Sequence, residues 1–319
     1  MSHAHFYTAD VFTERRFGGN QLAVFPDARA IPEAHLLPIA REFNYSEVTF
    51  VYPPADRAHT RRVRIFTPGG EIPFAGHPTV GTAHVLVATG EVRPAEPRSS
   101  EAPRESAGNG ELRLVLEEGV GPVPVLVRLE RGEPTFAQLS VAKLPEVVAR
   151  PRNVAELAEV LSLDPGDFVG GAYEPEALSS GIPFLMVPLA SSDAVRRARV
   201  RLDVWERTVR GTPSSEMMVF AMTEGEASGA SDVHARVFVP GLSVPEDPAT
   251  GSACAVLGGY LAARTPRDGG TLRWTVAQGL EMGRPSTIHV EADKAGGRVT
   301  AVRVGGTSVL VSEGRMWVR

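Results

Sequence analysis

Two similar stretches decide the fold of this chain: Glu71-Ile72-Pro73-Phe74-Ala75-Gly76-His77 and Glu246-Asp247-Pro248-Ala249-Thr250-Gly251-Ser252. Their Glu, Pro and Gly residues match in register, and a small residue precedes each Gly. Each stretch leads into a segment of small and aliphatic residues, which predicts a tight turn that opens a buried helix. Pro78 supports this prediction, because proline suits the first turn of a helix, where a missing N–H costs nothing.

A helix start of this kind presents backbone N–H groups and the positive end of the helix dipole, and both favour a bound anion. In both halves of the chain the same order of elements is predicted: a strand (residues 64–68 and 233–240), a turn, the shared pattern and a helix. We therefore expect two similar lobes whose anion-binding ends face one cleft. The alternative is that both stretches are ordinary turns that lead from a loop into a helix.

The size and composition of the chain exclude several classes of protein. Its 319 residues suffice for one large or two medium domains with an ample core. A net charge of -5 argues against a nucleic-acid-binding surface. The one cysteine, Cys254, excludes an internal disulfide and a metal site built from several cysteines. Neither a signal-peptide pattern nor an apolar stretch of about 18 residues is present, so we expect a cytoplasmic protein without a membrane partner.

Short β-branched and aromatic runs alternate with turn residues along most of the chain, which is typical of strands. Helices are predicted at residues 32–43, with a kink or a late start at Pro38, at residues 153–161 with Asn153 as N-cap, and around residues 192–207. Residues 91–112 are rich in Pro, Ser and Gly, which indicates a flexible surface excursion. Many strands and few helices predict two mostly β lobes, each wrapped on a helix, with a boundary near residues 133–140.

Three polar residues are candidates for a functional site, and each has a plain structural alternative. Asn20 follows two glycines and either forms a turn or lines a cleft. Glu47 begins a predicted strand and is either a solvated carboxylate or part of a pocket. His77 stands at a helix start, where the dipole disfavours a protonated imidazole. A neutral His77 could bind a substrate or relay a proton, or simply bond to nearby backbone. His84 lies two turns further on, but no third ligand stands at a spacing typical of a metal site.

Six motifs in chain order make this sequence resemble the PhzF-like phenazine-biosynthesis isomerase family. They are Gly18-Gly19-Asn20, Asn44-Tyr45-Ser46-Glu47, Phe66-Thr67-Pro68, Gly76-His77-Pro78-Thr79, residues 246–253, and Gln278-Gly279-x-Glu281-Met282-Gly283-Arg284-Pro285. The resemblance covers nearly the whole chain apart from residues 94–110. It implies the α+β fold of diaminopimelate epimerase, with two pseudo-symmetric lobes, each a mostly antiparallel β-barrel-like sheet around a central helix. The N-terminal lobe would comprise residues 1–136, completed by strands at 307–319, and the C-terminal lobe residues 137–306.

The resemblance also implies an isomerase that transfers a proton on a small amino- or hydroxy-carboxylate without cofactor or metal. In the best-known member the substrate is trans-2,3-dihydro-3-hydroxyanthranilate. By similarity Glu47 is the acid/base, and His77 and Asp247 flank the reacting part of the substrate. The residues expected to bind the substrate, in part through N–H groups at the two helix starts, are Asn20, Gly76, Thr250, Gly251 and Ser252. The resemblance further implies a homodimer.

Two other functions stay open at this point. Diaminopimelate epimerases and proline racemases share the fold and use one cysteine from each lobe, at positions that would fall near Ala75 and Thr250. Neither residue is a cysteine, and Cys254 is expected to be a small core residue, so racemisation by two thiols is disfavoured. The other alternative is a non-catalytic protein that binds a small acid or a partner and has kept the cleft.

Overall fold

The computed structural model describes residues 3–93, 109–149, 153–223, 231–242 and 244–318. Contacts between residues divide the chain into two compact units, one formed by Met1–Ala142 together with Gly305–Arg319 and the other by Lys143–Val304. Of the excursion predicted at residues 91–112, the part at 94–108 lies outside the described residues, and the last residues belong to a strand.

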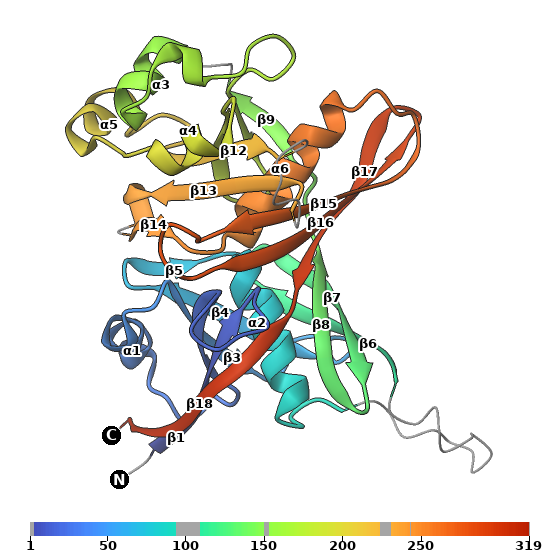
Figure 1. Cartoon of the computed structure of the whole chain (residues 1–319). Coiled ribbons are helices and arrows are strands. Elements are labelled where there is room, and N and C mark those ends of the chain that lie inside the picture. Colours follow the sequence, from blue (N-terminus) through green and yellow to red (C-terminus); the bar gives the residue numbers. More distant parts are fainter. Residues whose placement is uncertain (1–2, 94–108, 150–152, 224–230, 243, 319) are drawn as a thin grey trace. The chain divides into compact units, whose positions relative to one another are not determined.

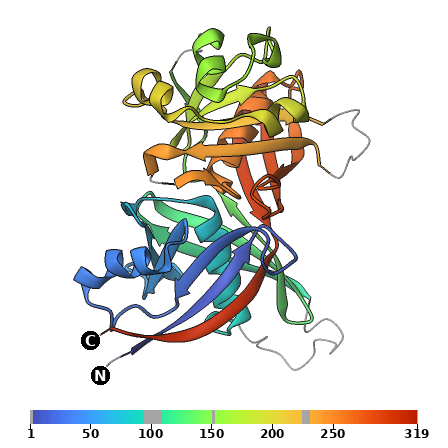
Figure 2. The same cartoon turned by 60° about the vertical axis from the view of Figure 1, so that its left-hand side comes forward.

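The first unit is built on a curled, mainly antiparallel sheet (Figure 1). Its strands are β1 (His3–Val11), β2 (Asn20–Phe25), β3 (Glu47–Tyr52), β4 (Arg61–Thr67), β5 (Gly70–Ile72), β6 (Gly110–Glu118), β7 (Gly121–Glu130), β8 (Glu133–Ser140) and β18 (Ser308–Trp317). The pairs β2–β3 and β4–β6 are parallel, and the other pairs within this unit are antiparallel. Figure 2 shows β1 and β18 running side by side, with His3 paired to Trp317.

A short helix connects β2 to β3 and covers an apolar cluster. The 3-10 turn Glu33–His35 precedes α1 (Leu36–Phe43), so the α-helix begins late, as predicted, and Pro38 lies in its first turn, where proline is tolerated. The helix ends at Asn44, which has a left-handed backbone (φ 52). Its buried side chains pack on the aromatic residues Phe25, Phe50 and Phe66.

The centre of the first unit is α2 (Gly76–Ala88), which is buried from Gly76 to Val87. It packs against β1, β2, β3, β7 and β8. Its small residues allow this close packing. A Cβ atom added at Gly81 would lie 2.5 Å from Val11 Cγ2 and 2.6 Å from Leu22 Cδ2, so β1 and β2 approach the helix backbone as closely as a glycine permits.

The second unit has the same kinds of element. Its strands are β9 (Glu146–Ala149), β10 (Glu176–Ser179), β11 (Pro183–Pro188), β12 (Glu216–Met222), β13 (Val233–Val239), β14 (Val244–Asp247), β15 (Gly270–Gln278), β16 (Ser286–Ala295) and most of β17 (Arg298–Gly306). The pairs β11–β12 and β13–β15 are parallel, whereas β9–β10, β10–β11, β12–β13, β13–β14 and β15–β16 are antiparallel. The buried helix α6 (Gly251–Arg264) packs against β10, β11, β15 and β16.

Three short helices cover one face of this unit: α3 (Val154–Leu161), α4 (Ser192–Arg197) and α5 (Leu202–Thr208). Asn153 caps α3, as predicted, because its side chain accepts a hydrogen bond from the N–H of Ala155. The helices pack on β11 and β12 through an apolar cluster that includes Leu157, Val195 and Trp205.

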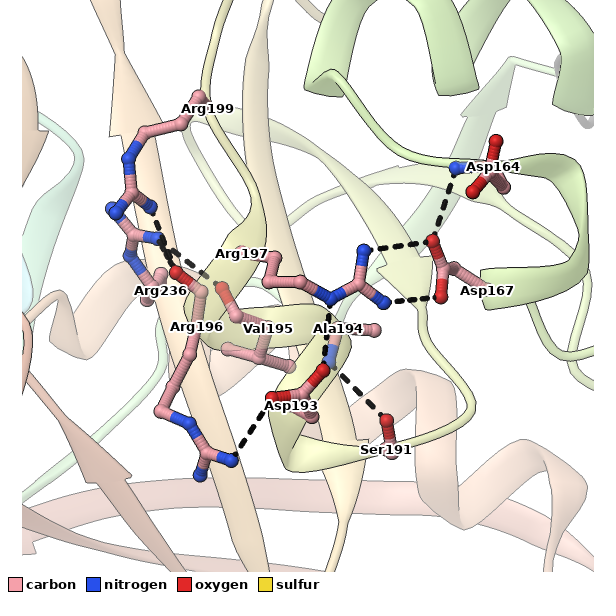
Figure 3. A network of polar contacts seen from close by, with 10 residues as sticks. All are labelled: Asp164, Asp167, Ser191, Asp193, Ala194, Val195, Arg196, Arg197, Arg199 and Arg236. Carbon is pink, nitrogen blue, oxygen red and sulfur yellow. Dashed lines mark hydrogen bonds and ion pairs between the residues drawn. The ribbon is translucent and has the colours of Figure 1, made fainter.

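The prediction of one helix around residues 192–207 is wrong, because α4 ends before α5 begins. The backbone of Ala198 is no longer helical (ψ 131), and the guanidinium group of Arg236 lies at the end of α4 (Figure 3). Its Nη1 atom donates to the carbonyl oxygens of Val195, Arg196 and Ala198 at 3.2, 3.2 and 2.8 Å. These carbonyls at the end of α4 thus bond to a side chain from β13 instead of to a further helical turn.

The structure as a whole is a mixed, sheet-dominated fold with few helices. In both units a strand, a short antiparallel strand and a buried helix follow one another, as β4–β5–α2 and β13–β14–α6. The first strand and the helix of each half were predicted from the two similar stretches, whereas the short strands β5 and β14 replace part of the predicted turn and pattern. Within the described ranges no helix is long and apolar enough to cross a membrane.

Candidate functional site

Glu47 and His77 meet in the first unit. Glu47 is the first residue of β3, and its side chain is 13% exposed, whereas His77 is the second residue of α2 and 3% exposed. The Oε2 atom of Glu47 lies 3.4 Å from the Nε2 atom of His77. Side chains alternate along a strand, so Glu47 shares a face of β3 with Thr49, whose hydroxyl lies 2.9 Å from that of Thr82 on α2. A hydrogen bond between these two threonines therefore connects the face of β3 that carries Glu47 to the helix that carries His77.

Asn20 fixes the orientation of the imidazole. The Nδ2 atom of Asn20 lies 3.1 Å from Nδ1 of His77, and both residues are buried. An amide nitrogen only donates, so Nδ1 accepts and the proton of the neutral ring is on Nε2, which faces Glu47. A helix start also favours the neutral form of the ring. The three side chains thus contact one another in the order Asn20, His77, Glu47, and the N–H group of His77 points towards the half-buried carboxylate of Glu47.

The start of α2 lies directly beside this chain of contacts. The N-cap residue is Ala75, which has no side-chain acceptor for the first N–H groups of the helix. Gly76 is the first helical residue and is buried. The positive end of the helix dipole is thus next to His77, in a place suited to an anionic group.

The second unit gathers the other predicted site residues at the start of α6. Asp247 ends β14, Thr250 is the N-cap of α6, and Gly251 and Ser252 begin the helix. All four are buried. The hydroxyl of Thr250 donates to Oδ2 of Asp247 at 2.6 Å, so this threonine holds the carboxylate instead of capping its own helix.

Gln278 organises this cluster, a role that sequence reasoning missed. Its Oε1 atom accepts from the N–H of Thr250 at 3.1 Å, and its Nε2 atom donates to the Thr250 hydroxyl at 3.1 Å and to the carbonyl of Asp247 at 2.7 Å. Gly279 follows with φ 74, and an added Cβ there would lie 2.6 Å from the carbonyl oxygen of Pro248. The only signal for this role in the sequence was the Gln278-Gly279 pair within the last of the six motifs.

A buried ionic network supports the strand that carries Asp247. Arg236 on β13 binds both carboxylate oxygens of Glu246 on β14 at 2.8 Å. Glu281 lies 3.0 Å from His234 and 3.9 Å from Arg236. Burial acts to raise the pKa of Glu281, but the hydrogen bond with His234, a backbone hydrogen bond and the charges of His234 and Arg236 together lower it below its usual value.

The chemistry of the remaining candidate groups is limited. Among the residues that the structure describes, no three or more His, Cys, Asp or Glu side chains gather where they could hold a metal ion. Cys254 lies inside α6, and burial, reinforced by the charge of Asp247, raises the pKa of its thiol. A buried thiol of raised pKa is inert as a nucleophile.

The predicted site residues therefore form two local groups. Asn20, Glu47, Gly76 and His77 lie together in the first unit. Asp247, Thr250, Gly251 and Ser252 lie together in the second.

Comparisons with known proteins agree on one family. A family model described as "Phenazine biosynthesis-like protein" matches residues 9–314. An uncharacterized isomerase of Mesorhizobium japonicum is 36% identical over 100% of both chains. The trans-2,3-dihydro-3-hydroxyanthranilate isomerase of Pseudomonas aeruginosa is 32% identical over 98% of this chain and 99% of its own. A PhzF-family crystal structure from Bacillus anthracis superimposes with a TM-score of 0.83 at 23% identity, covering 99% of this chain and 100% of that one, which shows a shared fold.

Proposed function

Since this chain belongs to the phenazine biosynthesis-like protein family and is an isomerase, we propose that it moves a proton between two atoms of a small amino- or hydroxy-carboxylate, with Glu47 as the acid/base. The observation that carries the proposal is the chain of contacts from Asn20 through His77 to Glu47. It joins a half-buried carboxylate to an imidazole whose donor atom faces it.

The proposed reaction uses only these side chains. The Glu47 carboxylate removes a proton from a substrate carbon, and the electron pair of the broken C–H bond moves into the adjacent unsaturated system. The resulting carboxylic acid then returns the proton to another atom of the same substrate, so no oxidant, reductant or metal is needed. His77 assists because its Nε2 atom, 3.4 Å from Oε2 of Glu47, stabilises the carboxylate electrostatically while it is charged. General acid–base catalysis of this kind accelerates reactions by about 10²–10⁴-fold.

We further propose that the groups at the two helix starts bind the substrate. The N–H groups of Gly76, Gly251 and Ser252 suit a carboxylate, because N–H groups at a helix start favour anions. Asp247 suits the amino group or hydroxyl of the substrate, since its carboxylate is held in place by Thr250. Substitutions in the first unit and in the second unit can test these roles separately.

The experiment that tests the acid/base is exchange of hydrogen with solvent. Trans-2,3-dihydro-3-hydroxyanthranilate serves as the first probe, because it is the substrate named for a relative that is 32% identical. A panel of small amino and hydroxy acids serves as the second. The protein is incubated with each compound in D₂O, and deuterium at carbon is measured by NMR or mass spectrometry. We expect exchange with at least one compound and a loss of about 10²-fold or more in Glu47→Gln.

The matched control is Glu42→Gln, which changes an exposed glutamate on α1 in the same unit. This variant should exchange deuterium at the wild-type rate. Exchange that survives Glu47→Gln unchanged would exclude Glu47 as the base. Binding of an acid with no exchange in the wild-type protein would instead support the non-catalytic alternative for that compound.

A further inference from the structure

Thr79, in the first turn of α2, has a hydroxyl group with two oxygen partners. Its Oγ1 atom lies 2.7 Å from the carbonyl oxygen of Ala75 and 2.6 Å from Oε1 of Glu118, the last residue of β6. A threonine hydroxyl has one hydrogen to donate, and a carbonyl oxygen only accepts. Both short contacts are full hydrogen bonds only if Glu118 is protonated and donates to Thr79, which then donates to Ala75.

The surroundings of Glu118 favour the protonated form. Its residue is 8% exposed, and within the described ranges its carboxylate makes no ion pair and its Oε2 atom has no hydrogen-bond partner. Burial therefore raises its pKa to about 8, although the hydrogen bond with Thr79 acts in the opposite direction. At neutral pH the side chain is mostly a neutral carboxylic acid.

The titratable and charged groups on the neighbouring elements do not compensate a charge on Glu118. Several are engaged with other residues: Glu117 accepts N–H bonds from Ala55 and Asp56, His77 contacts Glu47, and Arg64 pairs with Glu33 and Glu71. His84 is neutral, because burial lowers its pKa to about 4. The remaining groups on β4, β6, β7 and β8, none of them within ion-pair distance of Glu118 in the described part of the chain, are Arg61, Arg62, Glu111, Arg113, Arg128, Glu130 and Glu133.

The turn after Glu118 holds the same segment from the other side. The N–H of Val120 donates to the carbonyl of Pro73 at 3.0 Å. A Cβ atom added at Gly119 would lie 2.8 Å from Cα of Pro73, so the turn is in close contact with the backbone that leads into α2. The β6–β7 turn thus fixes the entry to the helix, and Glu118 fixes its first turn.

We propose that Glu118 is a positioning residue whose protonated side chain holds the start of α2, and with it Gly76 and His77, in place. When Glu118 ionises at alkaline pH, the hydroxyl hydrogen of Thr79 turns to the carboxylate. Ala75 then loses that hydrogen bond, and the buried charge of Glu118 has the Thr79 hydroxyl as a partner but no ion pair. The effect on the start of α2 stands on the contacts alone, whereas its effect on catalysis rests on the proposed function.

The first test follows the helix start by NMR as the pH rises from 6 to 10. With ¹³C-labelled glutamate carboxyl groups, we expect one carboxyl signal to titrate near pH 8 and to be absent in Glu118→Gln. The backbone amide signals of Gly76 and His77 should shift with the same midpoint in the wild-type protein. Glutamine can donate to Thr79 through its amide but cannot ionise, so this transition should be missing in the variant.

Two further variants separate the effect of the Glu118–Thr79–Ala75 contacts from a general effect of pH. Glu117→Gln changes the adjacent carboxylate, whose pKa is held at about 2 by the N–H groups of Ala55 and Asp56, and it should leave the alkaline transition unchanged. Thr79→Val removes the hydroxyl, so Glu118 should still titrate while the amide signals of Gly76 and His77 no longer follow it. A Glu118 carboxyl that titrates below pH 6, or an amide transition that survives Glu118→Gln or Thr79→Val, would overturn the proposal.

The second test measures the consequence for the reaction. With a probe that the wild-type protein exchanges, we expect the rate near pH 9 to fall about tenfold below that of Glu118→Gln, because about nine-tenths of a group with a pKa of 8 is ionised there. The rates should agree near pH 6.5, and equal rates at both pH values would exclude a role in positioning the reaction. Glu47→Gln should lose exchange at every pH and keep the NMR transition, so failure of the proposed function and failure of this inference are distinguishable.

Discussion

Removing Arg236 should destabilise the second unit more than removing any exposed arginine. Arg236 is 4% exposed and makes two 2.8 Å contacts with the Glu246 carboxylate. It also donates to the carbonyl oxygens of Val195 and Arg196 at the end of α4, which Figure 3 shows, and to that of Ala198. Arg236→Met keeps most of the apolar stem of the side chain. It leaves the carboxylate of Glu246 mostly buried and without its ion pair to residue 236. Removing one partner of a buried pair costs about 3–5 kcal/mol, or roughly a 10²–10⁴-fold change in the folding equilibrium.

The control is Arg273→Met in the same unit. The side chain of Arg273 is 69% exposed and contacts Glu291 once, at 3.0 Å. An exposed pair of this kind contributes about 0–1 kcal/mol. The double variant Arg236→Met with Glu246→Met removes both members of the Arg236–Glu246 pair, so it should be more stable than Arg236→Met alone.

The assay is urea unfolding followed by the fluorescence of Trp205. This tryptophan is 4% exposed and donates from Nε1 to the carbonyl of Ser215, so its signal reports on the second unit. Replacing Trp274 and Trp317, the other two tryptophans, by phenylalanine in every variant leaves Trp205 as the one tryptophan reporter. A loss below about 1 kcal/mol for Arg236→Met, or a loss equal to that of Arg273→Met, would refute the reasoning.

Two other predictions concern buried ionisable groups. Burial lowers the pKa of His84 to about 4, so as the pH falls the unfolded state binds a proton before the folded state does. Stability that is present above about pH 6.5 should therefore be lost as the pH falls through 4. The variant His84→Gln should lose less stability over this range, and equal losses in calorimetry would contradict the assignment. Lys294 donates at 2.9 Å to the carbonyls of Ala262 and Thr265 at the end of α6. Lys294→Met should therefore lower the free energy of unfolding in urea by about 2–3 kcal/mol and speed hydrogen exchange in the last turn of α6. A loss below about 0.5 kcal/mol would show that these bonds contribute little.

Local signals in the sequence predicted most of the elements. The N-cap Asn153 and the end of the first helix at residue 43 were predicted correctly, because helix capping and helix ends depend on one residue and its nearest neighbours. The two helices that follow the similar stretches were also predicted, since their small and aliphatic residues mark them as buried throughout. The family was recognisable from motifs in chain order, and the comparisons confirm it.

Errors arose where a distant residue decides a local structure. The break between α4 and α5 could not be read from residues 192–207, whose pattern suits one helix. The carbonyls at the end of α4 accept hydrogen bonds from the side chain of Arg199 within the segment and from that of Arg236, which comes from a strand much later in the chain. The hydrophobic pattern of a segment carries no information about a hydrogen-bond donor that folding brings to the end of its helix from elsewhere in the chain.

The sequence by itself therefore determined the family, most of the strands and the two buried helices, because these depend on local preference, on spacing and on the types of residue along the chain. The strands β9, β10 and β15 were not predicted. Only the tertiary structure decided which polar groups meet: His77 with Asn20 and Glu47, Thr250 with Gln278 and Asp247, and Glu118 with Thr79. The physical reason is that a hydrogen bond needs its two atoms within about 3 Å. Strand pairing and helix packing set that distance between residues that are far apart along the chain.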